Sequence, residues 1–493
     1  MKRTALSILF PVDQFHCRSI FLFQTFKMSS YAPLKTPPSP PSAPSPRPPE
    51  AGASAKVLKN KGPAPREPAL IGWWEGPVRA VVKDWLPRGR NPVSGNSTGE
   101  PAASAAAAAA AMATAKRLAA PPLWPIEARL AALLPDLLVF RKPRGSEPEL
   151  ATAQGVLLGV HVTGFTALMD RFSLSCKLEH DMDRLARIFS YYISDIVEHV
   201  LCFGGDILNI TGNVLLALWT VEQNQLSDII TLVAKCSLEI QEKFGIYHTR
   251  EGQDLQLKIG LSAGRISQFI VGDEQRQYLL VIGRDVDGVQ LAQRLAQANE
   301  IVLSWNCWKL CEQYMFEVEI MREDEAVKLR DMRIIDPFDF DEHFYKCLDY
   351  LPHYRTSADI LRTALELDPD SALEQTLRKH IMKNLLKKID EGQPMEYISE
   401  FRTVTIVLVS LEFHKTAWML HLCHLIQEAA LYISTVIEKG GGQLSRIFMF
   451  ETGCMFLCVF GLPGDKKPDE CAHALESSFN IFSFCWENLA ETK

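Results

Sequence analysis

The stretch FGGDILNITGNVLLALW, residues 203–219, holds two apolar runs joined by the turn T-G-N at 211–213. Two apolar runs around a tight turn are typical of a β-hairpin, so we predict two strands here. The turn of such a hairpin lies at the rim of its sheet. Asn209 and Asn213 are therefore expected at this rim, and what they do depends on the elements around the hairpin.

The segments that precede the hairpin alternate between strand and helix patterns. GVLLGVHV (155–162) predicts a buried strand, TGFTALMDRF predicts a helix that begins behind Thr163, and residues 183–200 have helical spacing. Further upstream, WPIEARLAALLPDLLVF (124–140) predicts a short amphipathic helix that ends at Pro135 and is followed by an apolar strand.

After the hairpin, we predict a helix at 228–243 and strands in 255–272 and 277–283. The whole order predicts an α+β fold, a sheet with helices on one face.

An internal repeat extends this pattern. Residues 435–461 have the same order of features as residues 199–219: a helix end, paired glycines, a strand, a turn and a strand. The apolar segment RTVTIVLVSLEF (402–413) precedes the second of these segments as GVLLGVHVTGF (155–165) precedes the first. We therefore predict a second copy of the fold at 401–493, truncated after its post-hairpin helix, and a helical connector at 346–400.

The first 122 residues differ from the rest in composition. Residues 1–123 hold 19 of the 29 prolines, and residues 102–111 are rich in alanine. We predict a disordered or extended leader over 1–122. Lys and Arg outnumber Asp and Glu there by 16 to 6, whereas Asp and Glu outnumber Lys and Arg by 53 to 36 in residues 124–493. An acidic globular part disfavours a nucleic-acid partner.

Targeting signals and cysteines point to a cytoplasmic protein. The apolar core ALSILF near the N-terminus is too short for an ordinary signal peptide, and no apolar stretch is long enough for a transmembrane segment. The twelve cysteines form no CxxC pair, and Cys307, Cys311, Cys454 and Cys458 have apolar surroundings. We expect reduced, buried thiols.

Together the motifs G-V-x-x-x-V-x-x-T-G-F-T, F-G-G-D-I-L-x-x-x-G-x-x-L-L-A-L-W, K-I-G-L-x-x-G and L-V-I-G-x-x-V resemble class III nucleotidyl cyclases, and most of all the soluble adenylyl cyclase group. The resemblance covers about 123–493. It implies a ferredoxin-like cyclase domain at 123–345, the connector at 346–400 and the truncated second cyclase-like domain at 401–493. The family reaction converts ATP to cyclic AMP and pyrophosphate.

In that family two aspartates bind two Mg²⁺ ions, and Mn²⁺ can replace Mg²⁺. The matching positions here are His161 and Asn213. Because Mg²⁺ prefers carboxylate oxygens, we expect tight metal binding to be lost. His161 is then either a hydrogen-bonded structural residue or a ligand for a softer metal. His421 and His424, at i and i+3, raise the same metal question without a nearby carboxylate.

Four further positions follow from the resemblance. The soluble cyclases sense bicarbonate with a lysine and an arginine, which match Asn209 and Gln290 here, so both positive charges are gone. VQLAQRL (289–295) resembles the helix that supplies a catalytic asparagine and arginine, which match Gln290 and Arg294. The adenine-reading lysine of the second domain matches Arg446.

Residues Thr163, Gly164, Phe165 and Thr166 are predicted to open a helix where the family binds triphosphate. Free backbone N–H groups at a helix start bind phosphate without a particular side chain, although a simple helix cap explains the threonines equally well.

Two functional hypotheses remain open. The chain is either an adenylate cyclase of weakened activity or a non-catalytic pseudocyclase that binds a nucleotide or dimerises. The expected partners are ATP or another nucleotide, together with intramolecular pairing of the two cyclase-like domains or a homodimer.

Overall fold

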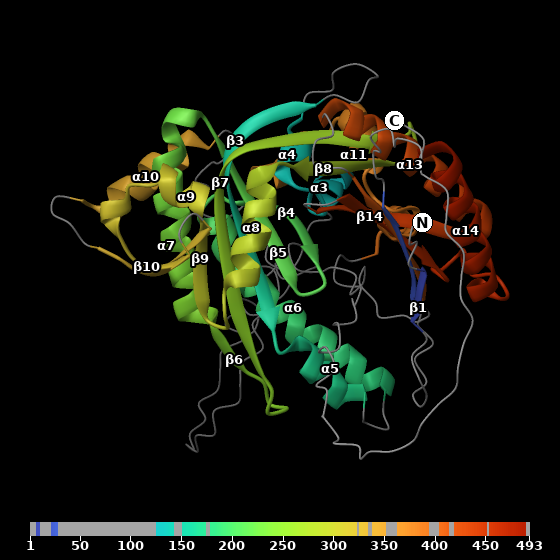
Figure 1. The fold of residues 1–493 in the computed structure, drawn as a ribbon, viewed down its shortest axis with the longest axis horizontal. Coiled ribbons are helices and arrows are strands. Elements are labelled where there is room, and N and C mark those ends of the chain that lie inside the picture. The colour runs from blue at the N-terminus through green and yellow to red at the C-terminus, as the bar shows by residue number, and fades with distance from the viewer. Residues whose placement is uncertain are drawn as a thin grey trace, which may run out of the picture.

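The computed structural model describes residues 6–9, 21–27, 125–141, 150–173, 178–322, 325–333, 338–351, 362–393, 404–413, 419–450 and 453–489. Two sheets organise these residues. In Figure 1 the larger sheet occupies the centre, and the orange and red elements of the second sheet lie beside it.

The larger sheet has the strand order β10-β11-β9-β7-β3-β5-β4, and β6 and β8 also pair with β7. Its strands are β3 (Ala151–Thr163), β4 (Asp206–Thr211), β5 (Val214–Val221), β6 (Ile246–His248), β7 (Asp254–Gly272), β8 (Gln277–Ile282), β9 (Glu300–Ser304), β10 (Phe316–Arg322) and β11 (Ala326–Met332). The predicted hairpin is confirmed, because β4 and β5 pair antiparallel up to the Thr211–Val214 pair. Strand β3 is central and pairs antiparallel with both β5 and β7.

Helices cover both faces of this sheet, so the predicted one-sided arrangement is wrong. The helices are α5 (Phe165–Ser173), α6 (Leu178–Cys202), α7 (Leu226–Phe244), α8 (Arg284–Leu295), α9 (Trp305–Leu310) and α10 (Phe340–Tyr350). Val156 and Leu158 of β3 pack in one core with α6 and α7. Leu157 points to the opposite face and packs with Val286 and Val289 of α8. The unbroken apolar run of β3 reflects burial on both faces.

The N-terminal helices differ from the prediction. Helix α3 (Ile126–Ala131) forms as expected, but Pro135 is followed by a second short helix, α4 (Asp136–Val139), and not by a strand. The carboxylate of Asp206 accepts the backbone N–H groups of Asp136 and Leu137, each at 2.8 Å. These bonds satisfy N–H groups that a helix start leaves unpaired, so a helical turn is favoured over an isolated strand.

The connector packs against these helices. It contains η4 (Thr363–Leu365), α11 (Ser371–Arg378) and α12 (Lys383–Asp390), which share a small core with α3 and α4. The other short helical turns are η2 (Gln223–Gln225), η3 (Gln313–Met315) and η6 (Cys485–Leu489).

Beyond the connector the elements are β12 (Thr405–Glu412), α13 (Met419–Gly440), β13 (Gly442–Phe450), β14 (Gly453–Phe460) and α14 (Glu470–Phe484). Strands β12 and β13 both pair antiparallel with β14, as β3 and β4 both pair with β5. Two segments of the predicted leader, β1 (Leu6–Leu9) and β2 (Phe21–Lys27), join this sheet, where β2 runs parallel to β12. The rest of the predicted leader, through residue 122, lies outside the described residues.

Helix α13 corrects one statement about the sequence. Among the described residues, its segment Leu420–Gly440 is long and apolar enough, by length and composition alone, to cross a membrane. The prediction missed it because His, Gln and Glu interrupt the apolar run. In this structure Ile426, Ala429 and Ile433 of α13 are buried in the core with β12 and β14.

Candidate functional site

A cavity of about 890 Å³ lies between the larger sheet and the second region, which we define as the described part of residues 404–489 with β12, α13, β13, β14 and α14. Strands β4 and β8 and helix α8 line one side, and β12, β13 and β14 line the other. The connector contributes Arg362, residues 380–382 and Leu385. The predicted site residues that line this cavity are Phe165, Thr166, Asn209, Asn213, Gln290, Arg294 and Arg446. His161, Thr163 and Gly164 are not among the lining residues; they lie in the chain between Gly159 and Phe165, which are.

His161 and Asn213 lie in direct contact. Asn213 Nδ2 lies 2.8 Å from His161 Nε2 and donates to the carbonyl of Val162 at 2.9 Å. Because a backbone carbonyl only accepts, the atom facing it is the amide nitrogen. That nitrogen is a donor, so His161 Nε2 must accept and the ring proton is assigned to Nδ1.

These two side chains do not fit Mg²⁺. The lone pair of His161 Nε2 accepts a hydrogen bond, and Asn213 turns an N–H group, not an oxygen, toward it. Mg²⁺ requires oxygen ligands in octahedral geometry, and neither side chain supplies a carboxylate. Among the described residues no group of three or more His, Cys, Asp or Glu side chains could hold a metal ion. His421 and His424, both exposed on α13, are included in that statement.

The start of α5 is shaped by a close backbone approach. Gly164 has φ of +84°, and a Cβ there would lie 2.3 Å from the carbonyl oxygen of Asp254. Thr163 Oγ1 donates to the carbonyl of Gln256 at 3.1 Å, so this hydroxyl binds the neighbouring strand. The side chain of Phe165 packs on Phe189, with ring centroids 4.4 Å apart. Only glycine therefore fits at 164, where the chain leaves β3 for the helix.

Arg446 and Asn209 also meet, from opposite sides of the cavity. Arg446 Nη1 donates to Asn209 Oδ1 and, at 3.1 Å, to the carbonyl of Ile210. Desolvation and, to a smaller extent, the nearby charge of Arg276 lower the pKa of Arg446 to about 10. Arg446 thus ties β13 to the hairpin that carries Asn213.

Helix α8 places Gln290 and Arg294 one turn apart, as the sequence predicts. Gln290 Nε2 donates to the carbonyl of Met449 at 3.3 Å and so contacts the second region. Arg294 is exposed at the cavity rim.

Three basic residues of the cavity lining were missed by the sequence analysis: Arg276, Arg362 and His380. Arg276 lies in the turn between β7 and β8, where its guanidinium stacks over the Tyr278 ring at 4.9 Å. Arg362 and His380 come from the connector. The charged turn DEQRQ at 273–277 was the available signal for Arg276, but no sequence pattern places the connector beside the hairpin.

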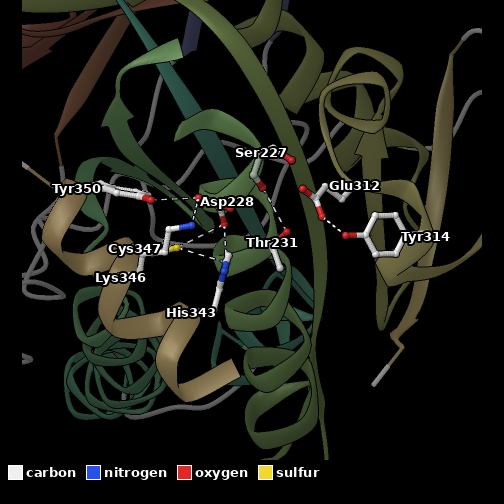
Figure 2. Close-up of polar contacts among 9 residues, drawn as sticks. All are labelled: Ser227, Asp228, Thr231, Glu312, Tyr314, His343, Lys346, Cys347 and Tyr350. Atoms are coloured by element: carbon white, nitrogen blue, oxygen red, sulfur yellow. Dashed lines mark hydrogen bonds and ion pairs between the residues drawn. The ribbon is translucent and has the colours of Figure 1, made fainter. Parts of the chain in front are cut away.

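A second polar cluster, around Asp228 of α7, is shown in Figure 2. Lys346 and Tyr350 of α10 donate to the Asp228 carboxylate at 3.0 and 3.3 Å. His343 Nε2 lies 3.1 Å from the backbone carbonyl oxygen of Asp228. Cys347 Sγ lies 3.3 Å from His343 Nε2. Burial and the Asp228 charge raise the pKa of the Cys347 thiol to about 12, so it is no thiolate nucleophile. The cluster fastens α10 to α7.

Comparison with known proteins gives close relatives for most of the chain. It is 46% identical to adenylate cyclase type 10 of Oryctolagus cuniculus over 359 residues, which are 72% of this chain and 22% of the relative. The Homo sapiens adenylate cyclase type 10 is 46% identical over 364 residues, 73% of this chain and 22% of the relative. No protein-family model matches the chain.

Solved structures give weaker matches. The adenylyl cyclase CyaB from P. aeruginosa has a TM-score of 0.31 and 17% identity, covering 38% of this chain and 97% of that chain. A bacterial light-regulated adenylyl cyclase has a TM-score of 0.32 and 14% identity, covering 49% of this chain and 68% of that chain.

The chain therefore spans about a fifth of the length of its curated relatives. The 46% identity extends over nearly three quarters of its residues, so it includes the region that carries the cyclase motifs. The chain is a homologue of adenylate cyclase type 10 and belongs to the class III adenylate and guanylate cyclase family.

Proposed function

We propose that this chain is a non-catalytic pseudocyclase that binds a nucleotide without cyclising it. The observation that carries the proposal is the hydrogen bond between Asn213 Nδ2 and His161 Nε2 at 2.8 Å. The two positions that match the family's metal aspartates bind each other here. Without two carboxylates, the charge that would hold two Mg²⁺ ions and a triphosphate is absent.

Nucleotide binding is supported by the helix start beside this pair. Thr166 and Phe165 line the cavity, and the first N–H groups of α5 have no partner within the helix. Backbone N–H groups at such a position bind phosphate oxygens. We propose that Thr163, Gly164, Phe165 and Thr166 form the phosphate end of the nucleotide site.

The second region is proposed to be a second cyclase-like copy that pairs within the chain. Its order of strand, helix, hairpin and helix repeats that of β3, α6, β4–β5 and α7. The cavity between the two regions supports intramolecular pairing over a homodimer. All ten described cysteines are free, which supports the proposed cytoplasmic location.

The first test measures cyclic AMP formation by the purified chain with Mg²⁺ and ATP. Losing about 4 kcal/mol of metal-derived stabilisation reduces a rate roughly a thousandfold, so we expect no product above background. Calorimetry with ATP and with GTP, under Mg²⁺, Mn²⁺ and chelator, then tests binding. We expect binding that does not depend on the metal. Turnover at an ordinary cyclase rate would contradict the first expectation, and absence of nucleotide binding would contradict the second.

A weak adenylate cyclase is the second candidate, favoured by the 46% identity to adenylate cyclase type 10. In that case Gln290 and Arg294 on α8 would contact the reacting nucleotide. Cyclic AMP that disappears in Arg294→Ala would select this candidate over the first.

A further inference from the structure

The cavity has an unusual charge balance. Its lining includes the side chains of Arg276, Arg294, Arg362 and Arg446 but no Asp or Glu. Arg362 is neutralised from outside the lining, because it pairs with the carboxylate of Asp136. Arg294 is exposed to solvent at the rim. The charges that remain inside the cavity are those of Arg446 and Arg276.

Arg446 has only neutral acceptors. It donates to the amide oxygen of Asn209 and the carbonyl of Ile210, and no carboxylate of the described residues pairs with it. Desolvation is the main cause of its lowered pKa, and a second positive charge, Arg276, adds to it. A desolvated cation without a counter-ion is costly, so an anion that enters the cavity gains more than it would at the surface.

Arg276 likewise has no carboxylate partner among the described residues. It lies over the Tyr278 ring and makes one long bond, 3.5 Å, to the carbonyl of Lys379. None of the ion pairs found among the described residues includes Arg276. The neighbouring His380 lines the same cavity, and its Nδ1 is buried without a hydrogen-bond partner. Desolvation and the charge of Arg276 lower the pKa of His380 to about 3, so it stays neutral and leaves the two arginines as the cations.

Part of the cavity wall is apolar. Six lining residues share one apolar cluster: Met382 and Leu385 of the connector, Ile406 and Leu408 of β12, and Met455 and Leu457 of β14. Leu457 is the cross-strand partner of Arg446. A volume of about 890 Å³ is within the range of ordinary small-molecule sites and much larger than an inorganic anion needs. The fitting ligand therefore has an anionic head and an apolar body.

We propose that the cavity binds an organic anion, a carboxylate or phosphate monoester with an apolar body, whose head group lies on Arg446 and Arg276 without a divalent metal. The site uses neither His161 nor Asn213, but it lies in the same cavity as the proposed phosphate end at α5 and includes Arg446, which matches the family's adenine-reading lysine. Its head-group residues also differ from Asn209 and Gln290, which carry no charge.

The test uses the full chain in chelator, with phenyl phosphate, benzoate and the neutral benzyl alcohol as probes. Saturable binding is measured by calorimetry and by the shift in melting temperature, at fixed ionic strength and pH. We expect both anions to bind and raise the melting temperature, and benzyl alcohol to do neither. The comparison of phenyl phosphate with benzoate shows which head group is preferred.

Variants locate the site. Arg446→Met and Arg276→Met should each weaken the binding of phenyl phosphate at least tenfold, because each removes one of the two positive charges that contact the head group. Arg330→Met, which changes an exposed arginine on β11, is the matched control and should change affinity less than twofold. If Arg446→Met does not fold, Arg276→Met alone decides.

The proposal is overturned if no anion binds saturably, if benzyl alcohol binds as well as benzoate, or if the arginine variants bind like the wild type. Because these measurements contain no nucleotide, their failure would leave the pseudocyclase proposal standing. If nucleotide fails to bind while phenyl phosphate still binds through both arginines, this proposal stands and the nucleotide proposal fails.

Discussion

The contact between His161 and Asn213 joins the end of β3 to the hairpin turn. Two hydrogen bonds fix Asn213, one to the imidazole and one to the carbonyl of Val162. A third bond runs from the Val162 N–H to the Asn213 carbonyl at 2.8 Å. The backbone on both sides of the pair is thus held in place independently of the two side chains.

This geometry predicts that two substitutions restore a cation site. His161→Asp together with Asn213→Asp should give Mn²⁺-dependent stabilisation by nucleotide, about 2.7 kcal/mol when ligand exceeds its Kd a hundredfold. Thermal melts with and without Mn²⁺ measure it. Cyclic AMP should stay low, because we propose that Arg446 replaces the lysine with which the family reads adenine. A double variant that is merely destabilised, with no response to cations, would mean that the backbone does not form a metal cradle.

Gly260 sets the distance between β7 and α8. A Cβ there would lie 2.6 Å from the backbone nitrogen of Gln293 and 2.8 Å from the carbonyl oxygen of Val289. Gly260→Ala should therefore push α8 off the sheet and cost about 1–3 kcal/mol in denaturant unfolding. Gly159, its cross-strand partner, is the control, since a Cβ there meets only movable side chains at 3.2 and 3.3 Å. Equal losses in Gly159→Ala and Gly260→Ala would contradict this account.

The sequence named candidate site residues, but it did not give their contacts. His161 and Asn213 were candidates because both lie in short motifs, at the end of β3 and in the hairpin turn. The bond from Arg446 to Asn209 joins residues 237 positions apart, and it depends on how the two regions pack. No local pattern encodes that packing.

At the scale of elements, the base of the hairpin is fastened by buried charges. Asp206 of β4 caps α4, and Arg362 of the connector binds Asp136 and the carbonyls of Ala131 and Leu134. Desolvation, followed by the charge of Asp136, raises the pKa of Asp206 from 3.8 to about 7.

This shift predicts a pH dependence of stability. A carboxyl group with a raised pKa in the folded state binds more protons folded than unfolded, so its ionisation opposes folding. The free energy of unfolding should fall as pH rises from about 4 to 7, by at most about 1.4 kcal/mol per unit from this group. Asp206→Asn should flatten the slope, whereas Asp368→Asn, an exposed carboxylate, should not. A slope unchanged by Asp206→Asn would refute the assignment.

The two wrong element predictions have one cause. DLLVF at 136–140 reads as a strand and folds as α4 because a distant carboxylate, Asp206, caps it. Likewise, helices were expected on one face of the sheet only. GVLLGV has no alternation of apolar and polar residues, as a strand buried on both faces requires, and α8 covers the second face. Local periodicity identified the long helices and the hairpin, while tertiary partners decided the rest.

At the scale of the whole molecule, the two regions share one core. Phe269, Leu280 and Ile282 of β7 and β8 are buried in the same cluster as α13 and β14. Tyr278 donates its hydroxyl to the carbonyl of Leu444 at 2.6 Å. Gln427 of α13 pairs with both backbone groups of Gly272, at 2.8 and 2.7 Å.

Residues 401–493 produced alone should therefore fail to fold. Without β7 and β8, the apolar face of α13 is exposed, and the backbone contacts to Gly272 and Tyr278 are lost. We expect no cooperative melting transition and poorly dispersed amide signals in NMR spectra. A sharp transition and well-dispersed spectrum from this fragment would show that the second region is an independent domain.

The pairing of His161 with Asn213 also bears on how this protein can change over generations. His161→Asp alone sets a carboxylate beside the Asn213 amide, which can donate to it and keep it occupied. Asn213→Asp alone sets one beside an imidazole, which can become its ion-pair partner. Neither single substitution yields two free carboxylates, so neither single variant gains metal binding on which selection could act. A first substitution toward a metal site would therefore have to spread without selection for metal binding.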